Sequence, residues 1–196
     1  STTLACLLEH LRHRGRVVTS LESPIEFLLG HGPSLVCQRE WPSDFQDWHQ
    51  AVQQAIEVSD TLLLPLGDAR LARLAVEAAE SGLLVVAHLP ATHGLNSLDR
   101  LTTLLEQPIW IRRLVEVLRG CYSQRLVPGK EGLLPVSEFM PAEVCRQALW
   151  TQEERPYPYW LDGREGTWSL MVSLQEWLDQ GKIEEDLAEN WAQSWL

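Results

Sequence analysis

The sequence predicts an α/β protein built on a parallel sheet, and three observations lead to that fold class. Short apolar runs that suit buried strands alternate along the chain with segments whose apolar residues recur at helical spacing. The 196 residues suffice for one domain with a small addition, and 45% of them are hydrophobic. Strand and helix in alternation are typical of a parallel sheet covered by helices.

The first half of the chain carries the clearest alternation. Ser1-Thr2-Thr3 is a cluster of capping residues, and the leucines after it predict an amphipathic helix over residues 3–13. Continuous apolar runs at 61–64 and 83–89 predict strands that are buried on both faces. The other expected elements are strands at 16–21 and 34–37, a helix capped by Ser43 and Asp44 that runs to 58, and a helix that begins at Asp68 and ends at Gly82.

The second half is expected to contain more helix. A segment from Glu153 to Gly166, rich in proline, aromatic and charged residues, predicts a linker or a docking strip. We therefore expect a core over 1–150, a linker over 151–166 and a helical region over 167–196. The remaining expected elements are helices at 95–105, 109–118, 141–150, 167–179 and 183–194, with strands at 121–127 and 133–136 around a turn at 128–130.

Composition excludes several classes of protein. A net charge of −11 disfavours a nucleic-acid partner bound by charge attraction. No two of the four cysteines form a CxxC motif, which disfavours a zinc or redox pair. No apolar run approaches the ~20 residues that a membrane span needs, and no signal peptide is visible. We expect a cytoplasmic protein with no direct membrane insertion.

Eight short strings carry a resemblance to a known family. Ser1-Thr-Thr-Leu-Ala5 matches the residues directly after the Gly-Lys of a phosphate-binding loop in that family, and Ser20-Leu-Glu-Ser-Pro-Ile-Glu-Phe27 resembles its Asp-box. The other strings are Leu35-Val-Cys-Gln-Arg-Glu40, Ala78-Ala-Glu-Ser-Gly82, Leu98-Asp-Arg100, Tyr122-Ser-Gln124, Glu138-Phe-Met140 and Gly166-Thr-Trp-Ser-Leu170. In this order they resemble the type II/type IV secretion ATPases over essentially the whole chain.

The resemblance implies a RecA-like P-loop NTPase core followed by a small helical C-terminal region. Members of the family bind ATP and Mg and work as hexameric rings that drive pilus retraction, pilus extension or secretion. For this chain it implies self-association into a ring, or a mixed ring with a pilus or secretion ATPase. It also implies an inner-membrane pilus platform protein as partner, and a location peripheral to the inner membrane.

Residue by residue, the resemblance implies a nucleotide site. Ser1 would be the loop hydroxyl that ligates magnesium, and Thr2 would sit beside the phosphates. Glu22 and Glu26 are the retained Asp-box carboxylates, and Glu26 would polarise the attacking water. Arg39 matches an arginine that faces nucleotide across a subunit boundary.

The chain departs from the family at catalytic carboxylates. Ser23 stands where the Asp-box has Asp. The Glu that ends the family's Walker B strand falls at Pro65 or at Gly67, depending on where a gap is placed, and neither residue has a carboxylate. Asp68 is close by, but it suits a helix cap better.

The family's His-box is also altered. Its two histidines are replaced by Leu83 and Pro90, whereas His88 and His93 stand at other positions. Two histidines without a third ligand fit the end of a strand better than a metal site.

These losses predict a fold that is retained while ATP hydrolysis is impaired. Two functions stay open: a motor ATPase in which Asp68 or Glu26 replaces the absent Glu, and a non-catalytic subunit of a pilus or secretion ATPase ring. Since Ser1 directly follows the position of the loop lysine, either the loop lies upstream or it has been lost. Six tryptophans suit helix packing or partner docking: Trp150, Trp160, Trp168, Trp177, Trp191 and Trp195.

Overall fold

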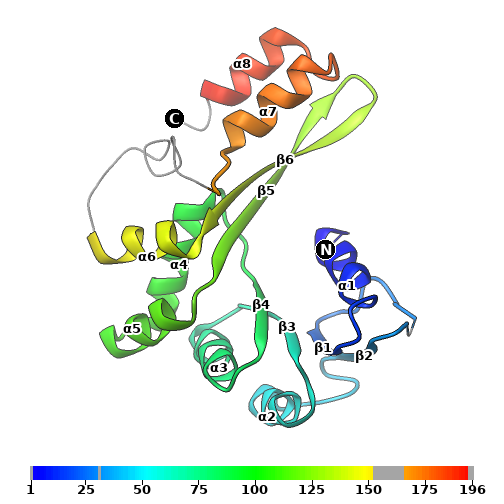
Figure 1. Ribbon diagram of the computed structural model, residues 1–196, viewed down its shortest axis with the longest axis vertical. Coiled ribbons are helices and arrows are strands. Elements are labelled where there is room, and N and C mark those ends of the chain that lie inside the picture. The colour runs from blue at the N-terminus through cyan, green and yellow to red at the C-terminus, as the bar shows by residue number, and fades with distance from the viewer. Residues whose placement is uncertain (1, 31, 152–165, 194–196) are drawn as a thin grey trace. The chain divides into compact units, whose positions relative to one another are not determined.

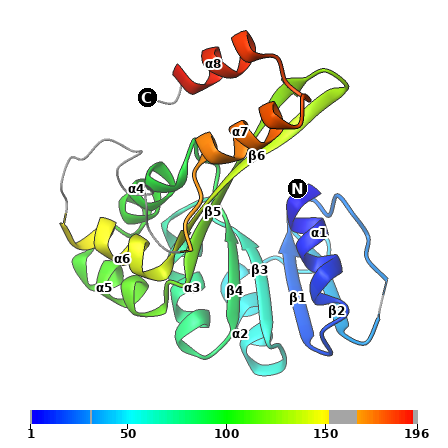
Figure 2. The same ribbon diagram turned by 45° about the horizontal axis from the view of Figure 1, so that its top comes forward.

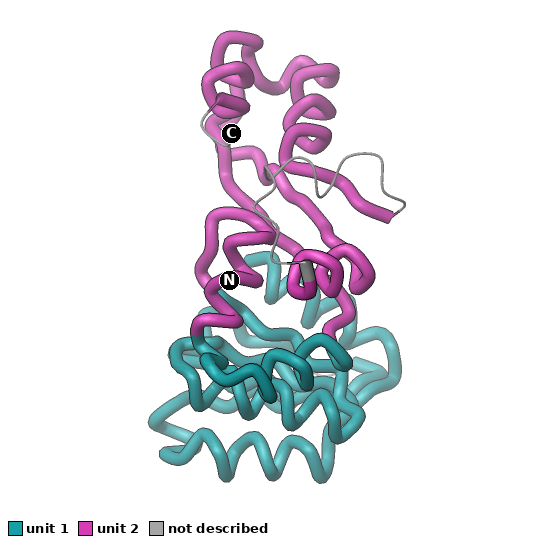
Figure 3. The backbone as a smooth tube through the Cα atoms, turned by 90° about the vertical axis from the view of Figure 1, so that its left-hand side faces the viewer, with its two compact units in different colours: residues 1–89, 104–117 teal, residues 90–103, 118–196 magenta. Residues whose placement is uncertain are grey.

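The computed structural model describes residues 2–30, 32–151 and 166–193 (Figure 1). The chain forms two compact units (Figure 3). Unit 1 comprises residues 1–89 and 104–117, and unit 2 comprises residues 90–103 and 118–196. The expected division into a core over 1–150, a linker over 151–166 and a helical region over 167–196 stays a prediction.

Unit 1 contains a four-stranded sheet in which every neighbouring pair of strands is parallel, as predicted (Figure 2). The spatial order of the strands is β2-β1-β3-β4. Parallel neighbours need crossover connections, and the crossovers from β2 to β3 and from β3 to β4 contain helices over 48–58 and 69–80. The strands are β1 (Val17–Glu22), β2 (Leu35–Glu40), β3 (Thr61–Pro65) and β4 (Leu84–His88).

The helix α1 (Thr2–Leu11) covers the face of the sheet that carries Val18 and Leu63. Leu8 and Leu11 of this helix are buried against those two strand residues. The amphipathic spacing of its leucines explains why it lies on the sheet. The helices of unit 1 are α1 (Thr2–Leu11), α2 (Trp48–Val58), α3 (Ala69–Glu80) and α5 (Pro108–Val117).

Capping side chains decide where α2 and α3 begin. The expected start of α2 at Ser43 and Asp44 was wrong, because the Asp47 carboxylate caps the helix by accepting from Gln50 N at 2.9 Å. Asp44 accepts from Glu40 N instead, at 2.8 Å, in the turn that follows β2. Asp68 caps α3 as predicted, accepting from Leu71 N at 2.9 Å.

The strand β3 is buried as predicted, but β4 is not. Residues 61–64 of β3 are all buried, whereas Leu84 of β4 is 42% exposed and Ala87 is exposed. The reason is the strand order, since no strand of the described residues pairs with the outer edge of β4.

Unit 2 is built around a long antiparallel hairpin of β5 (Gly120–Gly129) and β6 (Gly132–Pro141). Gly129 pairs with Gly132, so the turn is formed by residues 130 and 131 rather than by 128–130. The strands are longer than predicted because each continues past its apolar run. The helices of this unit are α4 (Gly94–Leu105, whose last two residues belong to unit 1), α6 (Ala142–Thr151), α7 (Leu170–Asp179) and α8 (Glu185–Gln193).

Two apolar clusters hold these helices to the hairpin. Met140 packs with residues of α4 and α6, including Leu98 and Cys145. Val127 and Val136 pack with residues of α7 and α8. In the described part of the chain, no helix has both the length and the apolar character needed to cross a bilayer.

The described C-terminal tryptophans differ in how far they are buried. Trp177 and Trp191 pack against the α7–α8 cluster, and Trp177 Nε1 donates to Pro135 O at 2.8 Å. Trp150 and Trp168 are exposed. Trp160, Trp195 and the segment 152–165 lie outside the described residues.

Unit 2 also contains a fully buried carboxyl group, that of Glu138 on β6. Its Oε1 accepts from Gly94 N at the start of α4, while no partner of its Oε2 is recorded within the described residues. Ser123 stands opposite it in the register of the hairpin. Burial raises the pKa of Glu138 to about 7, although the bond from Gly94 acts in the opposite direction.

We expect Glu138 to make stability depend on pH. In the folded chain its carboxyl stays neutral up to a pKa of about 7, whereas the ordinary value in the unfolded chain is 4.5. The folded state thus binds more protons in this interval, and stability falls as the pH rises through it, by about 3 kcal/mol at most. Urea unfolding at about pH 5 and about pH 8 measures this fall, and Glu138→Gln removes it.

The matched control is Glu143→Gln, which removes an exposed carboxylate on α6 in the same unit. This variant keeps the fall in stability. Histidines that titrate contribute equally to all three proteins, so they cancel in the comparison. A Glu138→Gln protein with the same pH dependence as the parent contradicts the prediction.

Candidate functional site

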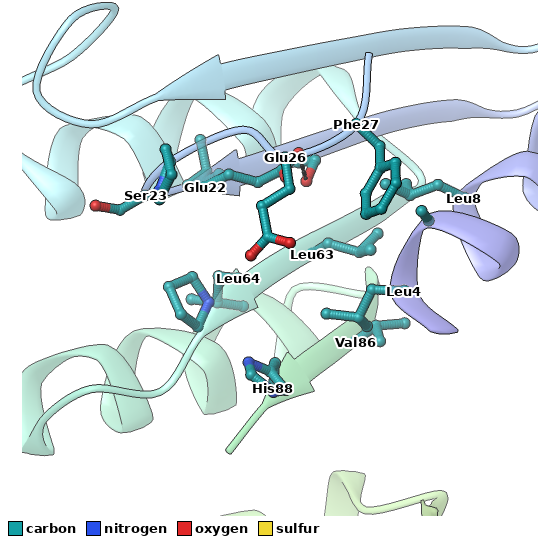
Figure 4. Close-up of a pocket in the computed structure, with 15 residues that line it drawn as sticks. Leu4, Leu8, Glu22, Ser23, Glu26, Phe27, Leu63, Leu64, Val86 and His88 are labelled. Carbon is teal, nitrogen blue, oxygen red and sulfur yellow. Dashed lines mark hydrogen bonds between the residues drawn. The ribbon is translucent and has the colours of Figure 1, made fainter. Parts of the chain in front are cut away.

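A pocket lies in unit 1 at the carboxyl ends of β1, β3 and β4 (Figure 4). It has a volume of about 190 Å³. The carboxyl ends of parallel strands are where open α/β sheets bind ligands. Its lining residues come from α1, the strand ends and the segment after β1: Leu4, Ala5, Leu8, Ser20, Leu21, Glu22, Ser23, Pro24, Glu26, Phe27, Leu63, Leu64, Pro65, Val86 and His88.

Two neighbouring side chains orient the carboxylate of Glu22. Ser20 Oγ donates to its Oε1 at 2.7 Å, and Gln38 Nε2 donates to the same oxygen at 3.0 Å. Ser20 and Gln38 are direct partners in the parallel register of β1 and β2, which brings their side chains to one face. Glu22 is therefore held at the strand end with its second oxygen available to the pocket.

The segment after β1 carries Glu26 into the pocket, and β2 holds that segment in place. Gln38 accepts from Leu29 N and donates to Phe27 O, both at 2.8 Å. Glu40 accepts from Ile25 N at 2.8 Å. Figure 4 shows the carboxylate of Glu26 directed into the pocket on the side of Leu64.

Arg39 lies outside the pocket, because alternate residues of a strand point to opposite faces. Its guanidinium donates to Gln54 Oε1 of α2 at 2.8 Å and to Asp44 O at 3.4 Å. It also lies 5.3 Å from the ring centroid of Phe45. Within this chain Arg39 therefore holds α2 and the preceding loop, and the structure does not bring it to Glu22 and Glu26.

Of the two predicted phosphate ligands, the structure describes only Thr2. Ser1 lies outside the described residues. Thr2 is exposed at the start of α1 and is absent from the lining. The helix instead contributes Leu4, Ala5 and Leu8, which make that wall apolar.

Of the two positions considered for the family's Walker B Glu, Pro65 lines the pocket and Gly67 does not. Pro65 is the last residue of β3 and lines the same pocket as Glu26. Asp68 is engaged as the cap of α3, which removes it from the carboxylates of the pocket.

The two histidines have separate environments. His88 lines the pocket at the end of β4; partial burial lowers its pKa, against the effect of Glu26. His93 belongs to unit 2, where its Nδ1 accepts from Asn96 N at 3.3 Å and burial lowers its pKa too. Within the described residues no group of three or more His, Cys, Asp or Glu residues could hold a metal ion.

The pocket therefore presents two carboxylates and one imidazole, with no Lys or Arg among its described lining residues. Carboxylates can bind the water shell of Mg²⁺ and orient a water molecule for attack. A bound phosphate would need positive charge from a metal ion or from residues beyond this lining.

Sequence reasoning missed three residues that build the site: Ser20, Gln38 and Glu40. Gln38 and Glu40 flank Arg39 in the string 35–40, from which the resemblance implies a role for Arg39 only. Strand alternation offered a signal, because residues on either side of Arg39 must share the face opposite to it.

Comparisons with known proteins identify several relatives. The type IV pilus retraction ATPase PilT of Pseudomonas aeruginosa is 32% identical over 133 residues, which cover 65% of this chain and 39% of the relative. The twitching motility protein of Neisseria gonorrhoeae is 30% identical over 138 residues, covering 67% of this chain and 37% of the relative. The chain thus spans well under half the length of these relatives. No family model matches it.

Solved structures of similar fold cover nearly the whole chain. A pilus retraction motor PilT with bound ADP superposes with a TM-score of 0.79 at 24% identity, covering 95% of this chain and 56% of the other. The ATPase DotB of Legionella pneumophila gives a TM-score of 0.83 at 22% identity, covering 98% of this chain and 56% of the other. These likenesses establish the RecA-like α/β fold that the motifs implied.

The motif order, the parallel sheet with its pocket at the carboxyl ends, and these relatives agree with one another. In sequence the chain is similar to the PilT-like ATPases of type IV pili, and in fold it is similar to the solved PilT and DotB structures.

Proposed function

We propose that this chain is the nucleotide-binding part of a pilus or secretion ATPase in which hydrolysis is impaired. The observation that carries the proposal is the pocket itself: Glu22 and Glu26 meet at the carboxyl ends of the strands, yet Pro65 occupies the wall where a further carboxylate would stand. The ADP bound to the related PilT structure supports a nucleotide as the ligand.

A hydrated magnesium ion fits the two carboxylates of the pocket, and it would supply the positive charge that the phosphates of ATP need. Glu22, oriented by Ser20 and Gln38, would hold the water around the metal. Glu26, on its tethered segment, would orient a water molecule. The resemblance to the family supports Ser1 and Thr2 as the residues on the phosphate side.

Impaired hydrolysis follows from the missing carboxylate. Proline has no group that accepts a proton or orients water, and each tenfold loss in rate corresponds to about 1.4 kcal/mol of transition-state stabilisation. Binding makes smaller demands on the site than turnover does, so nucleotide affinity is retained.

A second function is favoured by the absence of Lys and Arg from the described lining of the pocket. In that case the chain is a non-catalytic subunit that keeps the fold in order to join an ATPase ring. Binding of Mg-ATP separates the two functions, because only the first requires it.

We propose self-association into a ring, or a mixed ring with a related ATPase, at the inner-membrane pilus platform. Unit 1 carries apolar side chains suited to subunit contact on the segment after β1, on β2 and in the loop after it: Leu28 is 86% exposed, Leu35 56% and Trp41 41%. In a ring Arg39 would act across the subunit boundary only after releasing Gln54.

We expect Mg-ATP to stabilise the full-length protein against thermal unfolding, by about 2.7 kcal/mol at a ligand concentration 100 times Kd. Glu22→Gln weakens the magnesium-dependent affinity about tenfold, because an amide holds the hydrated metal less well than a carboxylate does. The measurement is a thermal shift with ATP in the presence and absence of Mg²⁺. Glu57→Gln, an exposed change on α2, is the control and keeps the full shift. Absence of any shift in the parent protein supports the non-catalytic subunit instead.

We expect Pro65→Glu to raise the rate of ATP hydrolysis at least about tenfold, since it returns a carboxylate to the end of β3. Nucleotide affinity stays within about twofold of the parent. Steady-state phosphate release measures the rate. Pro65→Ala is the control, because it removes the pyrrolidine ring of the proline without adding a carboxylate. If Pro65→Glu binds nucleotide normally but is no faster than Pro65→Ala, the account of impaired hydrolysis is wrong.

A further inference from the structure

A second hollow lies in unit 2, between β6 and α7, and it is independent of the nucleotide site proposed above. It has a volume of about 290 Å³ and is lined by Ser137, Trp168, Val172, Ser173 and Glu176. We call it the α7 groove.

The walls of the α7 groove are held firmly. Ser137 N donates to Ser173 Oγ at 3.1 Å, which ties α7 to β6. Ser169 caps the helix by accepting from Val172 N at 3.3 Å. Val172 and Glu176 are four residues apart, so they lie on one face of α7, along the groove.

The indole ring of Trp168 lines one part of the groove. Its ring stacks on Phe139 with the centroids 5.2 Å apart and an interplanar angle of 28°. Phe139 N donates to Trp168 O at 3.0 Å, so the backbone is fixed as well as the ring. Trp168 nevertheless remains 41% exposed, which leaves apolar surface on an ordered, pre-formed support.

Other apolar side chains extend this surface. Met171 and Val172 of α7 are 37% and 51% exposed. Tyr122 stands opposite Phe139 in the hairpin, and Leu126 shares its face by strand alternation; they are 47% and 53% exposed. An ordered apolar surface of this kind with a polar edge is typical of a protein interaction site.

The charge around the groove is strongly negative. Residues 166–193 include six Asp or Glu side chains and a single cation, Lys182. Lys182 Nζ lies 4.7 Å from the ring centroid of Trp177. Neither of these two residues lines the groove. Within the described residues no ion pair involves Glu176, so its carboxylate at the groove is available to a partner cation.

We propose that the α7 groove docks a basic amphipathic segment of a partner protein. An Arg or Lys side chain of that segment lies over Trp168 and pairs with Glu176, and its apolar side chains cover Val172 and Met171. A guanidinium or ammonium group gains from both an aromatic face and a carboxylate. Nucleic acids and anionic lipid surfaces are repelled by the same carboxylates, which favours a protein as the occupant.

Two synthetic peptides of about 14 residues test the proposal on the full-length protein. They share one pattern of leucines, and the polar positions are arginine in one and glutamate in the other. We expect the arginine peptide to bind in fluorescence anisotropy and the glutamate peptide not to bind. Trp168→Ala and Glu176→Gln weaken binding at least about tenfold.

Glu189→Gln is the matched control, since it removes an equal charge from an exposed site on α8 outside the groove. It changes the affinity less than about twofold. A second variant, Trp168→Phe, keeps an aromatic ring and serves if Trp168→Ala unfolds. We expect Trp168→Phe to retain most of the binding. Equal weakening by Glu176→Gln and Glu189→Gln shows charge attraction without a groove and overturns the proposal. So does failure of the arginine peptide to bind.

Discussion

The parallel register of the four-stranded sheet determines where the strand residues of the pocket stand. Ser20 is aligned with Gln38 on one side and with Leu63 on the other, and Leu63 is aligned with Val86. Because side chains alternate along a strand, this one register places Glu22, Pro65 and His88 at the strand ends of the face that α1 covers. A shift of one residue in any strand would send its pocket residues to the opposite face.

In the edge strand β2, neighbouring residues point to opposite faces of the sheet and therefore bind different parts of the chain. Gln38 and Glu40 bind the backbone of the segment that carries Glu26, whereas Arg39 between them binds Gln54 of α2. The carboxylates are thus positioned by neutral and acidic neighbours instead of by a basic one. This arrangement of carboxylates suits a hydrated metal ion better than a bare phosphate.

The hairpin of unit 2 has one face that carries the buried carboxyl group of Glu138 and another face that is exposed. The buried Glu138 holds the first residue of α4, and Val127 and Val136 hold α7 and α8. The exposed side of the same strands carries Tyr122, Leu126 and the Phe139–Trp168 stack. One antiparallel pair therefore both organises the unit and presents a surface for a partner.

Periodicity, capping residues and short motifs are local, so the amino-acid sequence predicts the fold class, most helices and strands, the cap at Asp68 and the resemblance to the family. It also singled out Glu22 and Glu26, which the structure brings to one pocket. The folded arrangement of the strands, by contrast, directs Arg39 away from the pocket, places Pro65 rather than Gly67 in its lining, and leaves β4 at an exposed edge. Those outcomes depend on strand order and register, which arise from contacts between segments far apart in the chain.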